Sequence, residues 1–286
     1  MAMWIEERAP SENANSRQNI ADEGRLRAWV ERLAVPRHVF ANARNNAWVR
    51  LELACALERL GLSVTIQGPH RNVVALPRDA DRRAITLIGA HYDSVPNCPG
   101  ADDNASGLAV MLECARLRSS SIGFVAFNAE EDGLLGSRDF VENGLRSLRI
   151  DVRRIHVLEM VGFRGDSSAQ ELPLPWVPRS MRTADFIGIV AKARTNATLE
   201  RAIRETAAPA LRVVGAKTWG PLHRILGDLT RSDHFPFWSA GLPALLWTDT
   251  GNFRNPHYHQ PTDTPETLDY AFMRDVTELL CAVVDA

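Results

Sequence analysis

Two neighbouring glutamates, Glu130 and Glu131, come directly after the apolar run SIGFVAFNA. Carboxylates placed this close repel each other, and each raises the pKa of its neighbour. A lone acidic pair is most simply explained as a strand end that lies in water. Histidine and carboxylate groups at equivalent places elsewhere would favour another explanation, because these two residue types are common ligands of divalent metal ions.

Ligand-type residues do occur in five separate connections of the sequence. Besides Glu130 and Glu131 they are His91 and Asp93 after AITLIGA, Asp102 and Asp103 in PGADDNASG, Glu159 after RIHVL, and His257 and His259 in NFRNPHYHQPTDT after PALLWTD. Each alone could be a helix cap, a surface acid or a locally bonded histidine. Ligands of open α/β sheets bind beyond the carboxyl ends of the strands, so we expect these side chains to meet at one rim.

Imidazole and carboxylate groups together form the ligand set that zinc takes at catalytic sites. In the HYD stretch, His91 and Asp93 point the same way if they continue a strand, and Asp93 can then hold the far ring nitrogen of His91. The pattern of residues leaves open which acid of the Asp102–Asp103 pair, and which histidine of His257 and His259, would bind a metal.

Apolar spacing predicts the elements that must position these groups. Helices are expected over 22–34, 42–60, from 108 onward, 134–145 and 198–207, with a short one at SDHFPFW. SVTIQG and NVVAL are expected to be paired strands, AITLIGA and PALLWTD to be buried strands, and SIGFVAF, RIHVLEM and DFIGIVAKA to be further strands. Thr264 and Pro265 predict the start of the final helix. Alternating strands and helices indicate a mainly parallel sheet covered on both faces, whereas 163–183 and 216–233 have no clear assignment.

Composition bounds the class of protein. The chain has 286 residues, of which 45% are hydrophobic, and a formal net charge of −2 at pH 7. This is enough for one large α/β domain and argues against nucleic-acid and membrane-surface partners. No apolar run reaches the ~18 residues of a membrane span, and the charged first residues lack the apolar core of a signal peptide. We expect residues 1–21 to be a polar, frayed segment and 22–286 to be the folded domain.

The four cysteines show no CxxC spacing, which favours free thiols and a cytoplasmic setting over a disulfide framework. Cys55 and Cys114 lie in helical apolar patterns and are expected to pack as small hydrophobes. Cys98 lies in the loop before Asp103, where a packed thiol is a better interpretation than a metal ligand.

Six stretches resemble a known family when taken in order: GAHYDSV, PGADDNASG, FNAEEDGLLGS, LEMVGF, SDHFPFWSAGLPALLWTDT and NPHYHQPTDTPETLDY. They are similar to those of the co-catalytic di-zinc aminopeptidases, metallopeptidase family twenty-eight, which also includes the glutaminyl cyclases. The resemblance spans residues 22–286. It implies a single-domain α/β zinc-peptidase fold, with a twisted, mainly parallel mixed sheet and helices on both faces.

The resemblance also implies a role for each candidate residue. His91 and Glu159 would hold one Zn²⁺, Glu131 and His259 a second, and Asp103 would bridge the two. Asp93 would orient His91, Glu130 would be the general acid/base, and a cis peptide is expected between Asp103 and Asn104. Asp233 is implied as an acid that supports or lines the site, and Tyr258 is a further residue expected to line it.

One position departs from the pattern: many characterised aminopeptidases of this family have Asp where this chain has Glu159. The longer side chain still supplies a carboxylate, although occupancy of that zinc position is less secure. Trp176, Trp219, Trp238 and Trp247 are candidates for the wall of an apolar substrate pocket, but ordinary packing in the core or on the surface explains each of them equally well.

The expected activity is removal of N-terminal amino acids from peptides with a free N-terminus by metal-activated water. The alternative is a glutaminyl-peptide cyclotransferase, which would use a single zinc bound by Asp103, Glu131 and His259. A binding protein that keeps the fold without catalysis should have lost ligands, whereas this chain retains all five together with Glu130. GxSxG and HExxH motifs are absent, so neither a serine nucleophile nor the other common zinc-peptidase signature is indicated.

Overall fold

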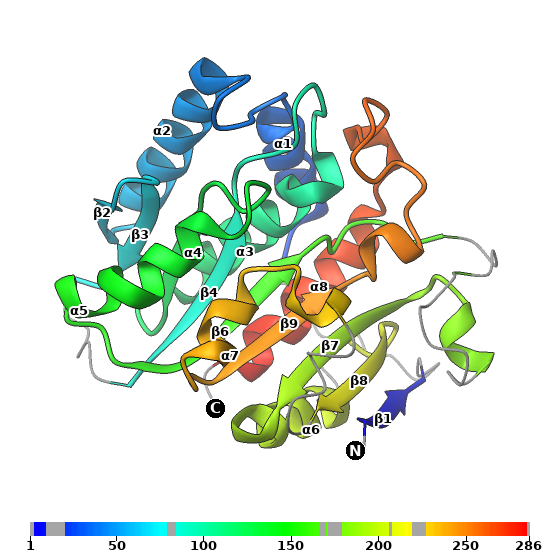
Figure 1. Ribbon diagram of the computed structural model, residues 1–286. Helices are drawn as coiled ribbons and strands as arrows, with labels where there is room; N and C mark the ends of the chain where they lie inside the picture. Colours follow the sequence, from blue (N-terminus) through cyan, green and yellow to red (C-terminus); the bar gives the residue numbers. More distant parts are fainter. Residues whose placement is uncertain are drawn as a thin grey trace.

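The protein is built around a mixed β-sheet. The structure is a computed structural model, and it describes residues 3–9, 21–78, 84–165, 170, 179–205, 208–218 and 227–284. Within these residues the sheet has nine strands in the order β1-β8-β7-β9-β6-β4-β5-β3-β2 (Figure 1). The strands are β1 Met3–Arg8, β2 Ser63–Gln67, β3 Asn72–Leu76, β4 Ile85–His91, β5 Gly123–Phe127, β6 Val152–Glu159, β7 Phe186–Lys192, β8 Arg212–Thr218 and β9 Ala244–Thr248.

The central strands β5, β4, β6 and β9 run parallel to one another, so their carboxyl ends meet at one edge of the sheet. Strand β7 is antiparallel to β9 and begins a second half-sheet, in which β8 is parallel to β7 and β1 is antiparallel to β8. Every residue of β4 and β5 is buried. Burial on both faces explains why these strands appear in the sequence as continuous apolar runs rather than as alternating patterns.

Helices cover both faces of the sheet, as expected (Figure 1). They are α1 Glu23–Leu33, α2 Ala43–Arg59, α3 Gly107–Arg118, α4 Leu135–Asp139, α5 Leu145–Ser147, α6 Asn196–Arg204, α7 His234–Ser239 and α8 Tyr270–Val283. The larger core joins α1, α2, α3, α6 and α8 to one face, and a second core around Phe127, Phe140 and Phe237 joins the turn Phe140–Gly144, α5 and α7 to the other. The predicted fold class is therefore confirmed. None of the helices in the described parts is long and apolar enough to cross a membrane.

The expectation of a frayed N-terminus is wrong for Met3–Arg8, which forms the edge strand β1. Ion pairs hold β1 against β8: Arg212 donates to Glu7 (Nε–Oε1, 2.8 Å), and Lys217 donates to Glu6 (Nζ–Oε1, 3.0 Å). The partners of these ion pairs lie more than 200 residues apart in the sequence, so the local sequence gave no sign that residues 3–8 form a strand. Strand β8, which overlaps the start of the unassigned stretch 216–233, was also missed, because Gly215 and Lys217 interrupt its apolar run.

Two smaller expectations also need correction. The final helix begins at Tyr270, where the Asp269 carboxylate accepts a hydrogen bond from the backbone N–H of Phe272, whereas Thr264 only precedes the single turn Pro265–Thr267. Cys55 is exposed rather than packed.

Cys114 is buried as expected, and its Sγ lies 3.4 Å from that of Cys281. Both thiols are free.

Candidate metal and substrate site

The side chains predicted to gather at one rim do so, at the carboxyl ends of the parallel strands. His91 is the last residue of β4, Glu159 is the last of β6, and Glu130 and Glu131 follow β5. Asp103 lies in the helical turn Ala101–Ser106 that precedes α3. His259 comes from the long connection between β9 and α8.

Three overlapping groups of these residues have the dimensions of metal sites, because the ligand atoms of each lie within 4.8 Å of one another. Two of them are His91, Asp103 and Glu159, and Asp103, Glu131 and His259; the third is His91, Glu130 and Glu131. Asp103 belongs to both of the first two groups. Its Oδ1 lies 3.1 Å from Nε2 of His91, and its Oδ2 lies 3.2 Å from Nε2 of His259.

The outer members complete each group at similar distances. Oε1 of Glu159 lies 3.5 Å from Nε2 of His91, and Oε2 of Glu131 lies 3.2 Å from Nε2 of His259. Two three-residue sets that share one carboxylate are what a pair of cations bridged by Asp103 would require.

Several polar atoms of the groups are buried without a hydrogen-bond partner among the described residues. They are Nδ1 and Nε2 of His91, Oδ1 of Asp103, Oε1 of Glu131 and Nε2 of His259. Unpaired polar atoms are costly to bury, so such a cluster calls for a ligand. Imidazole nitrogens and carboxylate oxygens match the donors that zinc takes, and the residues therefore fit the metal that their types suggest.

The charges of the site depend strongly on one another. Burial opposes ionisation of Asp103, but the close, positively charged rings of His259 and His91 outweigh it and lower the pKa of this carboxyl. Burial and the charge of Asp103 raise the pKa of Glu131 to about 7. Burial disfavours the charged form of His259, yet the nearby carboxylates of Asp103 and Glu131 raise its pKa to about 10. Protons on these histidines occupy the positions that a cation would take, because metals bind the neutral ring.

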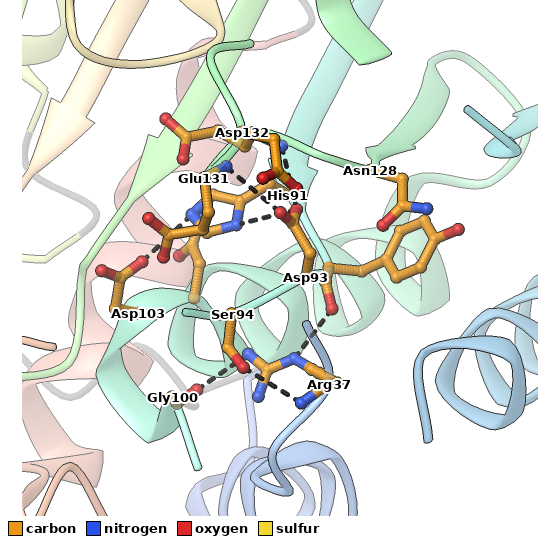
Figure 2. Close-up of polar contacts among 12 residues, drawn as sticks. Arg37, His91, Asp93, Ser94, Gly100, Asp103, Asn128, Glu131 and Asp132 are labelled. Atoms are coloured by element: carbon orange, nitrogen blue, oxygen red, sulfur yellow. Dashed lines mark hydrogen bonds and ion pairs between the residues drawn. The ribbon is translucent and has the colours of Figure 1, made fainter. Parts of the chain in front are cut away.

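Asp93 contacts both His91 and the backbone of the two glutamates that follow β5 (Figure 2). Its Oδ1 lies 3.5 Å from Nδ1 of His91. The same carboxylate accepts hydrogen bonds from the backbone N–H groups of Glu130 and Glu131, each at 3.1 Å. The predicted contact to His91 is thus present, while the two amide contacts had no signal in the sequence.

Asp263 holds the backbone of the turn that carries Asp103. The Asp263 carboxylate accepts hydrogen bonds from the backbone N–H groups of Asp102 (2.9 Å) and Asp103 (3.1 Å). The side chain of Asp102 is directed elsewhere and accepts from Asn255 and from the backbone of Gly162. Of the two neighbouring acids, the structure therefore brings Asp103 to both histidines.

The peptide bond between Asp103 and Asn104 is cis, as the resemblance implied. The Asn104 side chain donates to the carbonyl of Leu158 (2.8 Å) and accepts from the backbone N–H of Met160 (3.2 Å). It therefore joins the turn that carries Asp103 to the end of β6.

Arg37 is a further supporting residue that sequence reasoning missed. It is fully buried and donates to the carbonyls of Tyr92 (2.8 Å) and Gly100 (2.9 Å), and it also contacts the carbonyl of Pro99 (Figure 2). These bonds fasten the loop that runs from β4 to Asp103. Nothing in the sequence around Arg37 indicated this role.

Tyr258 and Asp233, two of the predicted supporting residues, take different places. The ring of Tyr258 stacks on that of His259 with a centroid distance of 3.7 Å, and its hydroxyl accepts a hydrogen bond from Arg231 (2.9 Å). Asp233 is fully buried, and burial raises its pKa to about 7, but it does not line the cavity. Ser232, just before it, was missed; it donates to Oε2 of Glu159 (2.7 Å).

The remaining aromatic and sulfur candidates contribute less. Trp176 and Trp219 lie outside the described residues. Trp238 and Trp247 are core side chains that donate to Ala244 O and to His156 Nδ1, and neither lines the cavity. Cys98 is a buried loop thiol whose Sγ donates to the carbonyl of Gln260, in keeping with the packed interpretation. His257 contacts Thr262 and belongs to neither metal group.

A cavity of about 510 Å³ opens beside the two groups and includes Glu130 in its lining. Much of its wall is apolar, from Leu134, Met160, Met181, Val190, Leu229, Leu246 and Phe253. A few convergent polar groups beside a mostly apolar pocket are typical of small-molecule and peptide-end sites.

Comparison with known proteins agrees with this geometry. Residues 72–284 match Peptidase family M28. The chain is 33% identical over 231 residues to the uncharacterised protein YfbL of Escherichia coli K12, covering 74% of this chain and 69% of YfbL. It is 30% identical over 234 residues to the aminopeptidase YwaD of Bacillus subtilis, covering 75% of this chain but only 44% of YwaD.

Solved structures give the same picture. The zinc aminopeptidase BSAP from Bacillus subtilis is 28% identical with a TM-score of 0.56, covering 74% of this chain and 49% of that one. The glutaminyl cyclase of Porphyromonas gingivalis is 19% identical with a TM-score of 0.69, covering 93% and 99%, and at that identity it supports the fold alone. The chain therefore belongs to peptidase family M28, and its relatives place it with the metallo-aminopeptidase hydrolases of that family.

Proposed function

We propose that this protein removes N-terminal amino acids from peptides and uses two zinc ions to do so. His91, Glu159 and Asp103 would hold one ion, and Glu131, His259 and Asp103 the other. The observation that carries the proposal is the position of Asp103, whose two carboxylate oxygens face two different histidines at 3.1 and 3.2 Å. A carboxylate placed this way serves a pair of cations better than a single one.

Zinc pairs of this kind polarise a carbonyl and lower the pKa of water from ~15.7 to about 7. The protein's own part in the chemistry then falls to Glu130. This side chain lines the cavity and lies close to His91 and Glu131, but it is outside the two sets that contain Asp103. Burial raises its pKa well above the usual value, and the charges of Glu159, Asp233 and Glu131 act in the same direction. A carboxyl with a raised pKa is suited to accept a proton from water and to deliver it to the leaving amine.

Other groups hold Glu130 and the substrate in place. The backbone N–H of Glu130 is fixed by Asp93, which also orients His91. Tyr258 lines the cavity, and burial raises the pKa of its hydroxyl, which therefore stays protonated. Because Arg231 donates to its oxygen, the phenolic hydrogen remains available to a substrate carbonyl. The carboxylates at this end of the cavity suit the ammonium group of a free N-terminus.

The alternative is a glutaminyl-peptide cyclotransferase with one zinc on Asp103, Glu131 and His259. The completeness of the other group argues against it: His91 is fully buried, and Asp103 and Glu159 lie within 3.5 Å of its Nε2. A single-zinc enzyme has no need of that second set.

One experiment separates the two. Purified protein is analysed for metal and is assayed with leucine-anilide and with a peptide that begins with glutamine. We expect about two zinc ions per chain and release of the anilide. One zinc ion per chain with cyclisation of the glutamine, and no release of the anilide, would assign the alternative instead.

A further inference from the structure

Two of the four cysteines lie side by side in the core, on helices that are far apart in the sequence. Cys114 belongs to α3 and Cys281 to α8, and their Sγ atoms are 3.4 Å apart. The two helices pack against each other, and both cysteines belong to the same apolar cluster (Figure 1). The sulfurs of a disulfide are ~2.05 Å apart, so these two Sγ atoms need to approach each other by only about 1.4 Å to form one.

The other two cysteines have different surroundings. Cys55 is exposed, and Cys98 donates from its Sγ to the carbonyl of Gln260. All four cysteines lie in the parts of the chain that the structure describes, and within those parts neither Cys55 nor Cys98 contacts another cysteine. An intramolecular disulfide that requires no rearrangement of the fold therefore joins Cys114 to Cys281.

Burial decides which thiol of the pair reacts first. Cys114 is fully buried, and burial raises the pKa of its thiol, which leaves it a poor nucleophile in the closed fold. Cys281 is 4% exposed and lies two residues before the end of α8 at Val283. Helix ends open locally more readily than the core does, so an opening of the last turn of α8 uncovers Cys281 first.

We propose that Cys114 and Cys281 are a disulfide-forming pair, which a small disulfide such as oxidised glutathione converts into a cross-link between α3 and α8. The thiolate of Cys281 attacks one sulfur of the reagent, breaks its S–S bond and forms a mixed disulfide, and one glutathione leaves. The thiolate of Cys114 then attacks the sulfur of Cys281 and displaces the second glutathione. The cysteines lose two protons and two electrons, and the two glutathione thiols gain them.

The cross-link closes a large loop of the chain. The two cysteines are 167 positions apart, and the segment between them carries Glu130, Glu131, Glu159 and His259. Closing a loop restricts the unfolded chain more than the folded one, and the restriction grows with the length of the loop. The oxidised protein should therefore stay folded to a higher temperature, whether or not the proposed aminopeptidase activity is correct.

The first test counts thiols. Cys55→Ala removes the exposed cysteine, which takes up glutathione independently of the pair, and leaves three thiols. This variant is treated with oxidised glutathione, unfolded, alkylated and analysed by mass spectrometry. We expect one alkylated cysteine, Cys98, and a peptide map that joins Cys114 to Cys281. Three alkylated cysteines, a link that involves Cys98, or glutathione retained by the protein overturns the proposal.

Single substitutions added to Cys55→Ala test the order of the two steps. Cys114→Ala should retain one glutathione on Cys281, because no second thiol is present to displace it. Cys281→Ala should retain none, because Cys114 is fully buried. Equal glutathione content in the two proteins overturns the assignment of Cys281 as the thiol that attacks first.

The effect on stability is measured on oxidised and reduced samples of the Cys55→Ala protein. We expect oxidation to raise the melting temperature by about 5–10 °C, the scale expected for a disulfide in a chain of this size. The matched control is the protein that also carries Cys114→Ala, in which oxidised glutathione should not raise the melting temperature. Each comparison is made within one protein, so a lower starting stability of the variant does not affect it. An equal rise in both proteins, or no rise in Cys55→Ala, overturns the stabilising role of the cross-link.

Discussion

Asp93 lies 3.5 Å from Nδ1 of His91 and accepts hydrogen bonds from the two amides that carry Glu130 and Glu131. One buried carboxylate therefore orients a metal-ligand candidate and also the strand end that bears the proposed base. Asp93→Asn keeps the volume but loses the charge and one of the acceptors. Because partners of this kind typically change metal affinity 10- to 100-fold, we expect zinc binding to weaken by about that factor. Competition with a chromophoric chelator measures it, and an unchanged affinity would contradict the orienting role.

Glu130 and Glu131 are neighbours with different proposed roles, and amide substitution separates them. Glu130→Gln should retain its zinc but lose a factor of ~10² to 10⁴ in kcat, because the proton acceptor is gone. Glu131→Gln should lose zinc as well, because Glu131 is one of the three candidate ligands in the group that it forms with Asp103 and His259. Metal analysis and kcat are measured on the same preparations.

The matched control for this pair is Asp132→Asn, the next acid in the chain, whose carboxylate contacts His38 at 3.5 Å rather than either metal group. It should retain both zinc and turnover. Undiminished activity in Glu130→Gln with full metal content would refute its assignment as the base.

Much of this site could be predicted because its residues follow buried strands. Buried parallel strands are the elements of an α/β protein that are easiest to recognise in the sequence, since they appear as continuous apolar runs. His91, Glu130, Glu131 and Glu159 all stand at such strand ends. The supporting groups could not be predicted in the same way. Asp263 reaches Asp103 across 160 positions of sequence, and Arg37 reaches Gly100 from the connection between two helices.

The outer half of the sheet was harder to predict for a related reason. In β1, Ile5 is followed by two glutamates, Glu6 and Glu7. Local propensity does not favour a strand for so short and polar a pattern. Its stability comes from pairing with β8, which tertiary structure alone reveals. The start of the last helix was misplaced because Thr264 and Pro265 are good initiating residues, but Leu268 is extended and interrupts the helix before Asp269 begins it again.

Glu159 tests whether the second zinc position is used in spite of its longer side chain. In Glu159→Gln the group around His91 keeps only one carboxylate, so we expect one zinc per chain where the wild type has two. Ser232 donates to Glu159, and Ser232→Ala should therefore lower occupancy of the same position less severely. Equal zinc content in the wild type and Glu159→Gln would show that this position is not a metal site.

Zinc removal should also destabilise the fold. Each ion that binds only the folded chain adds stability according to its concentration relative to Kd, about 2.7 kcal/mol at a hundredfold excess. A chelator should therefore lower the melting temperature, and added zinc should restore it. In Glu131→Gln the chelator should cause a smaller decrease, because one ligand set is already broken. A melting temperature that does not respond to the chelator would contradict metal binding by the folded protein.

His156 should make the protein sensitive to acid from a position outside the metal groups. It is fully buried in β6, where Nδ1 accepts a hydrogen bond from Trp247 (3.1 Å). Burial, with a smaller contribution from the charge of Arg154, lowers its pKa from 6.5 to about 3. The folded protein therefore keeps this ring neutral, whereas the unfolded chain binds a proton below pH 6.5. The stability that the neutral ring contributes is present above that pH and is lost as the pH falls toward 3.

Urea unfolding at pH 6, 5 and 4 measures this effect when wild type is compared with His156→Asn. Asparagine keeps an acceptor for Trp247 but cannot titrate, so the free energy of unfolding of the variant should fall less steeply between pH 6 and 4. The two slopes should differ by up to about 1.4 kcal/mol per pH unit, the value for one proton. Acid titration of the metal groups is common to both proteins and cancels in the difference. Parallel curves would mean that His156 does not take up a proton on unfolding, and acid sensitivity would then have to come from the carboxylates around Asp103.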